Sequence, residues 1–171
     1  MTMKKFLILT FVALMAFSGA SGQENEILKL KDQIIELQNN GKLGFQQFLL
    51  CSSIFTFASY IPLSEPVIGK TGTLLLYYEP HNIFTKKEDG MYEVWYTQDM
   101  VLLNQEGTVI QEWPDILEFH HRAGKPVMDV FAQNSLDFDG SIPPGKYKFK
   151  AVLKDKIRGE SVVKIIDFEL R

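Results

Sequence analysis

The sequence has few of the residues from which common functional sites are built. Its 171 residues include one cysteine and three histidines, and neither sign of charge dominates, with 18 Lys and Arg against 21 Asp and Glu. A single cysteine excludes an internal disulfide. The net charge of −3 provides no basic surface for nucleic acid or for an anionic membrane. We therefore expect neither as a partner.

Motifs for catalysis are also missing. No serine lies in a nucleophile elbow, no glycine-rich loop precedes a helix, and Cys51 has no histidine near it in the sequence. His120 and His121 beside Glu118 are the best candidates for a metal site, but adjacent residues on a strand point to opposite faces. The sequence thus predicts a protein that is not an enzyme and has no metal or cofactor.

The composition is that of an ordinary folded protein. Hydrophobic residues make up 46% of the chain and charged residues 23%, which excludes a wholly disordered chain or a coiled rod. The length allows one compact domain and a short appendage.

The first 22 residues are typical of a bacterial signal peptide. Lys4 and Lys5 are followed by the mostly apolar residues 6–17 and by the small residues 18–22, as in the three regions of such peptides. Twelve residues fall short of the about 20 that a membrane-spanning helix needs. We expect export to the periplasm or beyond, with cleavage after Gly22 or after Ala20, and no stable membrane span after cleavage.

Cleavage would leave an acidic mature protein with one thiol. Loss of Lys4 and Lys5 leaves 16 basic against 21 acidic residues, a net charge of −5. Cys51 follows three apolar residues, and free cysteines are among the most buried residue types. A buried thiol and an intermolecular disulfide are the two interpretations.

An amphipathic helix is predicted at residues 24–39, within a segment (23–43) that also contains a joint. Ile27, Leu30, Ile34 and Leu37 recur at steps of three and four, which is the period of a helix with one apolar face. A helix this short is marginal alone, so this face should be covered. Docking on the domain and self-association both remain open, and residues 39–42 are expected to form a flexible joint.

The rest of the chain, 44–171, is typical of a β domain. Segments rich in Val, Ile, Thr, Phe and Tyr alternate with Gly, Pro and Asn. The expected strands are 54–61, 71–79, 91–103, 108–110, 116–121, 127–134, 146–153 and 162–170. Seven or eight strands at this spacing predict an antiparallel β-sandwich.

The last two strands carry the most specific pattern. Pro143, Pro144 and Gly145 form a turn, and Tyr147 then begins a strict alternation of apolar residues with lysines. This segment resembles the final hairpin of immunoglobulin-like or fibronectin-III-like domains. The resemblance implies that Tyr147 forms a tyrosine corner, in which the hydroxyl bonds to the backbone of the preceding connection.

Together with the pattern of residues 50–82, this hairpin resembles exported bacterial proteins of uncharacterised function that join a short N-terminal region to one such sandwich. The function that we expect is a non-enzymatic binding or assembly module of the cell envelope, which binds another envelope protein or a second copy through residues 24–39. The alternative is a small envelope enzyme or a metal-dependent sugar-binding protein that uses His120, His121 and nearby acids.

Overall fold

The computed structural model describes residues 3–171, and it describes side chains for residues 22–171. Helix α1 (Met3–Asn40) contains the helix predicted at residues 24–39. The predicted signal peptide, apart from Gly22, lies outside the residues with described side chains. Among the described residues, no helix combines the length and the apolar character that crossing a membrane requires. One compact unit ends at Leu37, and the other spans Gln38–Arg171.

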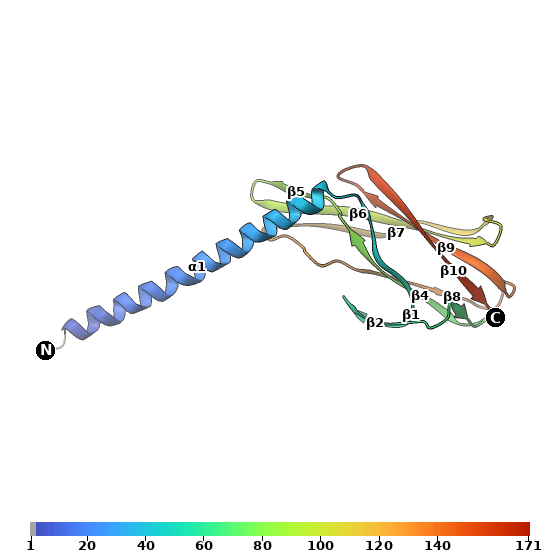
Figure 1. Cartoon of the computed structure of the whole chain (residues 1–171), viewed down its shortest axis with the longest axis horizontal. Coiled ribbons are helices and arrows are strands. Elements are labelled where there is room, and N and C mark those ends of the chain that lie inside the picture. The colour runs from blue at the N-terminus through green and yellow to red at the C-terminus, as the bar shows by residue number, and fades with distance from the viewer. Residues whose placement is uncertain (1–2) are drawn as a thin grey trace. The chain divides into compact units, whose positions relative to one another are not determined.

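The second unit is a β-sandwich, as the sequence predicts (Figure 1). In the described part of the chain its first sheet has four strands in the order β2-β1-β4-β8. Their bounds are β1 (Gly44–Thr56), β2 (Ser59–Pro62), β4 (Thr73–His81) and β8 (Ala132–Asp137).

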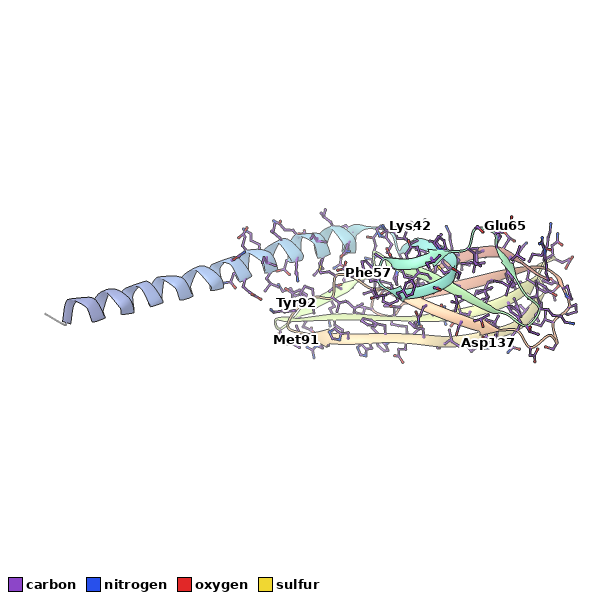
Figure 2. The ribbon with its side chains drawn as sticks, turned by 90° about the horizontal axis from the view of Figure 1, so that it is seen from below. Lys42, Phe57, Glu65, Met91, Tyr92 and Asp137 are labelled. Atoms are coloured by element: carbon purple, nitrogen blue, oxygen red, sulfur yellow. The ribbon has the colours of Figure 1, made fainter. Side chains whose placement is uncertain are left out.

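The second sheet has the order β3-β10-β9-β6-β5, and β7 also pairs with β6. Its strands are β3 (Val67–Ile68), β5 (Thr85–Glu88), β6 (Met91–Asn104), β7 (Val109–Ala123), β9 (Gly145–Asp155) and β10 (Glu160–Leu170). Figure 2 shows Met91 and Tyr92, at the start of β6, at the end of the sandwich opposite Glu65 and Asp137.

Strand β6 is an interior strand of the second sheet. It pairs with β7 along one edge, and with β5 and then β9 along the other. Residues 96–103 are buried on both faces of the strand. The apolar run of residues 100–103 suits this position, because a strand covered on both sides reads as continuous rather than alternating hydrophobicity.

The core between the sheets draws on both layers. Leu74, Leu76 and Tyr78 of β4 pack with Met100 and Leu102 of β6 and with residues of β9 and β10. Burial of apolar side chains of this size stabilises the fold by about 1.5–3 kcal/mol each before entropy is counted. A polar chain crosses the core, because the Tyr78 hydroxyl donates to Gln98 Oε1, and Gln98 Nε2 donates to Asn134 Oδ1 at 3.1 Å.

The strand predicted at residues 54–61 is wrong as a single element. The chain turns at Phe57 and Ala58, and β1 and β2 form a hairpin on either side of this turn. Ala58 has a positive φ of 54°, and its N–H donates to the Tyr77 hydroxyl at 2.9 Å. A tertiary contact from β4 therefore stabilises this turn. The local sequence does not predict the turn, because it contains no glycine, proline or asparagine.

The two strands predicted at 108–110 and 116–121 are one strand, β7. Pro114 does not end it, since proline is tolerated at edges and bulges of a sheet. The register with β6 shifts between the pairs Gln98↔Leu117 and Met100↔Trp113, so a bulge absorbs residues 114–116. The strand predicted at 127–134 is also displaced, because β8 begins only at Ala132.

The final hairpin forms as predicted. β9 pairs with β10 in continuous antiparallel register from Asp155↔Glu160 to Gly145↔Leu170. Tyr147 is 7% exposed, and its hydroxyl donates to the backbone carbonyl of Pro143 at 2.5 Å. Pro144 and Gly145 lie between these two residues, and Gly145 begins β9. This contact ties the turn before β9 to the core.

Removing the Tyr147 hydroxyl should destabilise the fold. We expect Tyr147→Phe to lower the free energy of unfolding by about 0.5–1.5 kcal/mol, the net contribution of one hydrogen bond, measured by urea denaturation. The matched control is Tyr60→Phe, because the Tyr60 hydroxyl donates to the Gln47 side chain at the exposed surface. Equal midpoints for Tyr147→Phe and the wild type would show that the corner contributes nothing to stability.

Candidate functional site

A groove of about 350 Å³ lies on the open side of the sandwich between β7 and β8. Its walls come from the two strands, and its floor includes two core residues, Met100 and Phe149, each only 2% exposed. The lining residues are Met100, Trp113, Ile116, Leu117, Gln133, Asn134, Ser135, Leu136 and Phe149. A surface hollow that opens onto the apolar core is a site where another apolar group would be removed from water.

Strand β7 forms one wall. It is 15 residues long and has no fully buried residue, and in the described part of the chain it pairs only with β6. Trp113 packs edge-on against Phe149, with ring centroids 6.4 Å apart. Ile116 lies at the rim, with 51% of its surface exposed. β7 therefore presents both an open backbone edge and apolar side chains to the groove.

A charged cluster holds the bulge of β7 in place. The Asp99 carboxylate accepts hydrogen bonds from the Asp115 backbone N–H at 2.8 Å and from Lys154 Nζ at 2.7 Å. Asp115 has a φ of 45°, a left-handed conformation that aspartate tolerates better than most residues. The bond to Asp99 raises the pKa of Lys154 above its ordinary value, so Lys154 stays positively charged at neutral pH.

Strand β8 forms the other wall. It pairs with β4 over all six of its residues, and within residues 3–171 its other edge has no strand partner. Asn134, which lines the groove, accepts a hydrogen bond from Gln98 of β6 in the opposite sheet. The edge of β8 is thus held in a fixed position.

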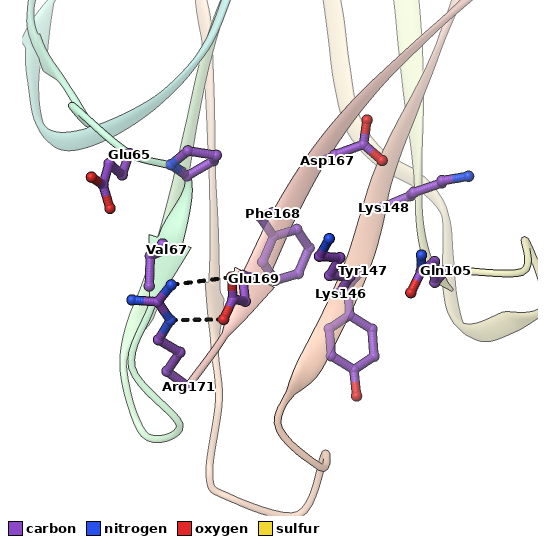
Figure 3. A pocket seen from close by; sticks show the side chains of 11 residues that line it. Glu65, Val67, Gln105, Lys146, Tyr147, Lys148, Asp167, Phe168, Glu169 and Arg171 are labelled. Carbon is purple, nitrogen blue, oxygen red and sulfur yellow. Dashed lines mark hydrogen bonds and ion pairs between the residues drawn. The ribbon is translucent and has the colours of Figure 1, made fainter.

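A larger groove of about 630 Å³ lies over the ends of β3, β9 and β10 (Figure 3). Three cationic and three acidic side chains surround it, namely Lys146, Lys148, Arg171, Glu65, Asp167 and Glu169. Arg171 Nε lies 2.7 Å from Glu169 Oε1, which lowers the pKa of this carboxyl. Because positively and negatively charged side chains are equal in number and mixed around the groove, it has no net charge that would select a charged ligand.

The two adjacent histidines lie on opposite faces of β7. His120 stacks on Trp95 with ring centroids 4.6 Å apart, and its Nε2 lies 2.8 Å from Glu93 Oε1. The ring of His121 lies 6.1 Å from that of Phe119 on the other face. Among the described residues, no group of three or more His, Cys, Asp or Glu side chains is placed to hold a metal ion.

Cys51 is 2% exposed, and burial raises the pKa of its thiol. It pairs with Leu75 across the β1–β4 ladder, on the face of the sheet where Tyr77 lies between Tyr60 and Phe131. A buried, protonated thiol is unreactive. This environment suits a structural side chain.

The four apolar residues of the predicted helix face are all exposed on α1. Their exposed fractions are 46% for Ile27, 51% for Leu30, 45% for Ile34 and 74% for Leu37.

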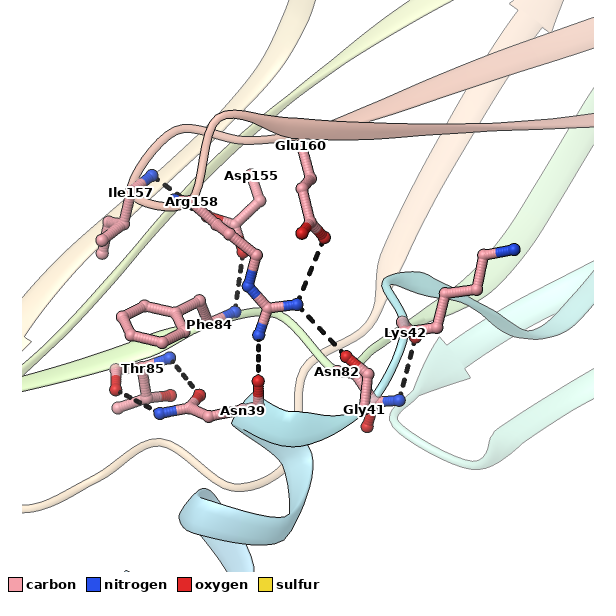
Figure 4. Close-up of polar contacts among 10 residues, drawn as sticks. All are labelled: Asn39, Gly41, Lys42, Asn82, Phe84, Thr85, Asp155, Ile157, Arg158 and Glu160. Atoms are coloured by element: carbon pink, nitrogen blue, oxygen red, sulfur yellow. Dashed lines mark hydrogen bonds and ion pairs between the residues drawn. The ribbon is translucent and has the colours of Figure 1, made fainter.

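The segment predicted as a flexible joint is bonded to the sandwich. Asn39 and Thr85 exchange two hydrogen bonds of 2.9 Å, from Asn39 Nδ2 to the Thr85 carbonyl and from the Thr85 N–H to Asn39 Oδ1 (Figure 4). The Arg158 guanidinium donates to the carbonyls of Asn39 and Gly41. A Cβ at position 41 would collide with Asn82. These contacts place residues 38–43 in the same compact unit as the sheets, whereas the sequence suggests a boundary at residue 44.

Asp155 organises this region. Its Oδ1 accepts the backbone N–H groups of Ile157 and Arg158, at 3.0 and 2.8 Å, and its Oδ2 accepts that of Phe84 at 2.7 Å. The side chain is 2% exposed. One carboxylate thus shapes the β9–β10 turn, which carries Arg158, and joins it to the connection between β4 and β5.

Sequence reasoning identified the turn residues and Cys51 but missed the β7–β8 groove. Trp113, Leu117 and Leu136 belong to no motif in the sequence. The one available signal is the set of apolar residues beside Pro114, a residue that favours an edge strand.

Comparisons with known proteins add little to this geometry. No protein-family model matches the chain, and no curated protein matches its sequence. One solved structure that matches belongs to a family 123 glycoside hydrolase from Clostridium perfringens, studied for glycolipid glycan hydrolysis. The identity is 11% and the TM-score 0.47, over 77% of this chain and 27% of that chain. The chain therefore spans about a quarter of that protein, and a likeness this distant carries no argument about function.

Removing the Asp155 carboxylate should destabilise the fold strongly. We expect Asp155→Ala to cost at least about 3 kcal/mol, because three backbone N–H groups lose their acceptor. Asp155→Asn should cost less, since one side-chain oxygen can still accept from the β9–β10 turn. Denaturant midpoints would measure both effects.

Asp167→Ala is the matched control for Asp155, because Asp167 is an exposed carboxylate on the neighbouring strand β10. The free energy of unfolding of the Asp167→Ala variant should differ from that of the wild type by no more than about 0.5 kcal/mol. Similar losses for Asp155→Ala and Asp167→Ala would contradict the role assigned to Asp155.

Proposed function

We propose that the chain is a non-enzymatic binding module of the bacterial cell envelope, exported by its N-terminal signal, which binds a protein partner in the β7–β8 groove. The observation that carries this proposal is the groove itself. It opens onto buried Met100 and Phe149 between two strand edges that have no partner in the described residues. An apolar hollow beside open edges suits side chains of another protein.

The sandwich belongs, in this proposal, to the immunoglobulin-like class. The bond from Tyr147 to Pro143 supports this assignment, because the tyrosine corner of such domains bonds to the backbone a few residues upstream. Domains of this class act as scaffolds for many roles. The proposal of a binding role therefore rests on the groove and not on the class.

Export rests on the sequence. Lys4, Lys5 and the apolar residues 6–17 support it. Helix α1 is, in this proposal, a second attachment region, to another envelope protein or to a second copy of the chain. Exposure of Ile27, Leu30, Ile34 and Leu37 supports that role, since apolar residues at helical spacing are the pattern by which helices associate.

No observation favours the enzymatic or metal-dependent alternative. His120 is already engaged by Trp95 and Glu93, and His121 faces the other side of β7. The two rings are therefore unsuited to bind one ion together.

A charge at the rim of the groove should abolish partner binding. We expect the tagged full chain, expressed in its native cells, to retain an envelope protein that Ile116→Glu loses by tenfold or more. The physical reason is that a carboxylate would have to be buried against the partner without a counter-charge. Quantitative mass spectrometry of the captured proteins is the measurement.

The control is Ile165→Glu. Ile165 is 47% exposed, close to the 51% of Ile116, and lies on β10 away from the residues that line this groove. Ile165→Glu should therefore retain the partner. If both variants capture every protein as the wild type does, the groove is not the binding site.

A further inference from the structure

The free strand edges beside the groove indicate how the backbone of a bound partner would be held. Resting on the proposed function, we propose that a partner protein inserts an extended segment that pairs with β8 and becomes a fifth strand of the four-stranded sheet. This mode of recognition uses main-chain hydrogen bonds for affinity and alternate side chains for specificity.

The choice of β8 over β7 follows from the two edges. Along β7, Pro114 has no N–H to donate, and the bulge at residues 114–116 interrupts the ladder. Edges blunted by proline and bulges resist pairing. β8 has six residues, none of them proline, in unbroken register with β4. Among the described residues, β8 therefore offers the regular edge beside the groove.

The edge of β8 is also preformed. Six consecutive pairs with β4 set its direction, and the bond from Gln98 to Asn134 fixes it to the other sheet. Gln98 is fully buried, and Asn134 is half-buried where it lines the groove. An added strand would not have to order β8 when it binds, which lowers the entropic cost of association.

The environment on each side of β8 defines the chemistry of the segment. A strand that matches β8 is about 20 Å long at about 3.3 Å per residue, so roughly three of its side chains enter the groove. These would contact Trp113, Leu117 and Phe149, which favours apolar and β-branched residues. The alternate side chains would lie on the other face of the sheet, where Gln133 and Ser135 pair with Tyr77 and Leu75 and are exposed, which favours polar residues.

Synthetic peptides test this inference on the full chain. The probe is a capped nine-residue peptide, Lys-Thr-Val-Thr-Val-Thr-Val-Thr-Lys, and its matched control carries N-methyl groups on every valine and threonine. N-methylation removes the backbone donors and keeps the side chains. We expect the control to bind tenfold or more weakly than the probe, since several hydrogen bonds of about 0.5–1.5 kcal/mol each are lost. The probe should also slow hydrogen exchange at the β8 amides that are not bonded to β4.

The outcomes separate the inference from the proposed function. If both peptides bind equally and Ile116→Glu weakens both, strand addition is overturned while the groove stays a binding site. If the probe does not bind, or binds regardless of Ile116→Glu, an added strand at β8 is overturned. A dimer of the full chain with β8 amides already protected would make a second copy the occupant and overturn it as well. Loss of partner capture by Ile116→Glu tests the proposed function separately.

Discussion

The carboxylate of Asp155 is the contact on which one end of the sandwich depends. It accepts three backbone N–H groups, from Phe84, Ile157 and Arg158, so a single buried side chain satisfies donors from two connections. Arg158 is thereby placed where its guanidinium reaches the carbonyls of Asn39 and Gly41. The position where the chain enters the sheets thus depends on a turn more than a hundred residues later in the sequence.

The two sheets differ in how their edges are protected. The edge of β7 is long but broken by Pro114 and by a bulge that Asp99 and Lys154 hold in place. The edge of β8 is short and regular, and short length is itself a protection against unwanted pairing. Between these edges, the buried residues Met100 and Phe149 form part of the floor of the groove. The regular edge of β8 suits pairing with one added strand, as we propose. The edge of β7, interrupted by Pro114 and the bulge, disfavours the pairing of further strands.

Much of the fold could be predicted from the sequence where the pattern is local. The alternation after Gly145 predicted the β9–β10 hairpin, and the strand predicted at residues 91–103 corresponds closely to β6. Predictions failed where a distant residue decides the local structure. The Tyr77 hydroxyl stabilises the turn at Ala58, Asp99 holds the bulge of β7, and Arg158 with Thr85 fixes the expected joint.

The sequence by itself determined the all-β character of residues 44–171, the closing hairpin with Tyr147 and the absence of an internal disulfide. These follow from side-chain periodicity, turn residues and cysteine number, which are properties of neighbouring residues. Only the tertiary structure decided which strands lie at the edges, and therefore where a groove exists. Trp113, Leu117 and Leu136 become one surface because β7 and β8, in different sheets, lie on the same open side of the sandwich, and strand order between sheets has no local signature in the chain.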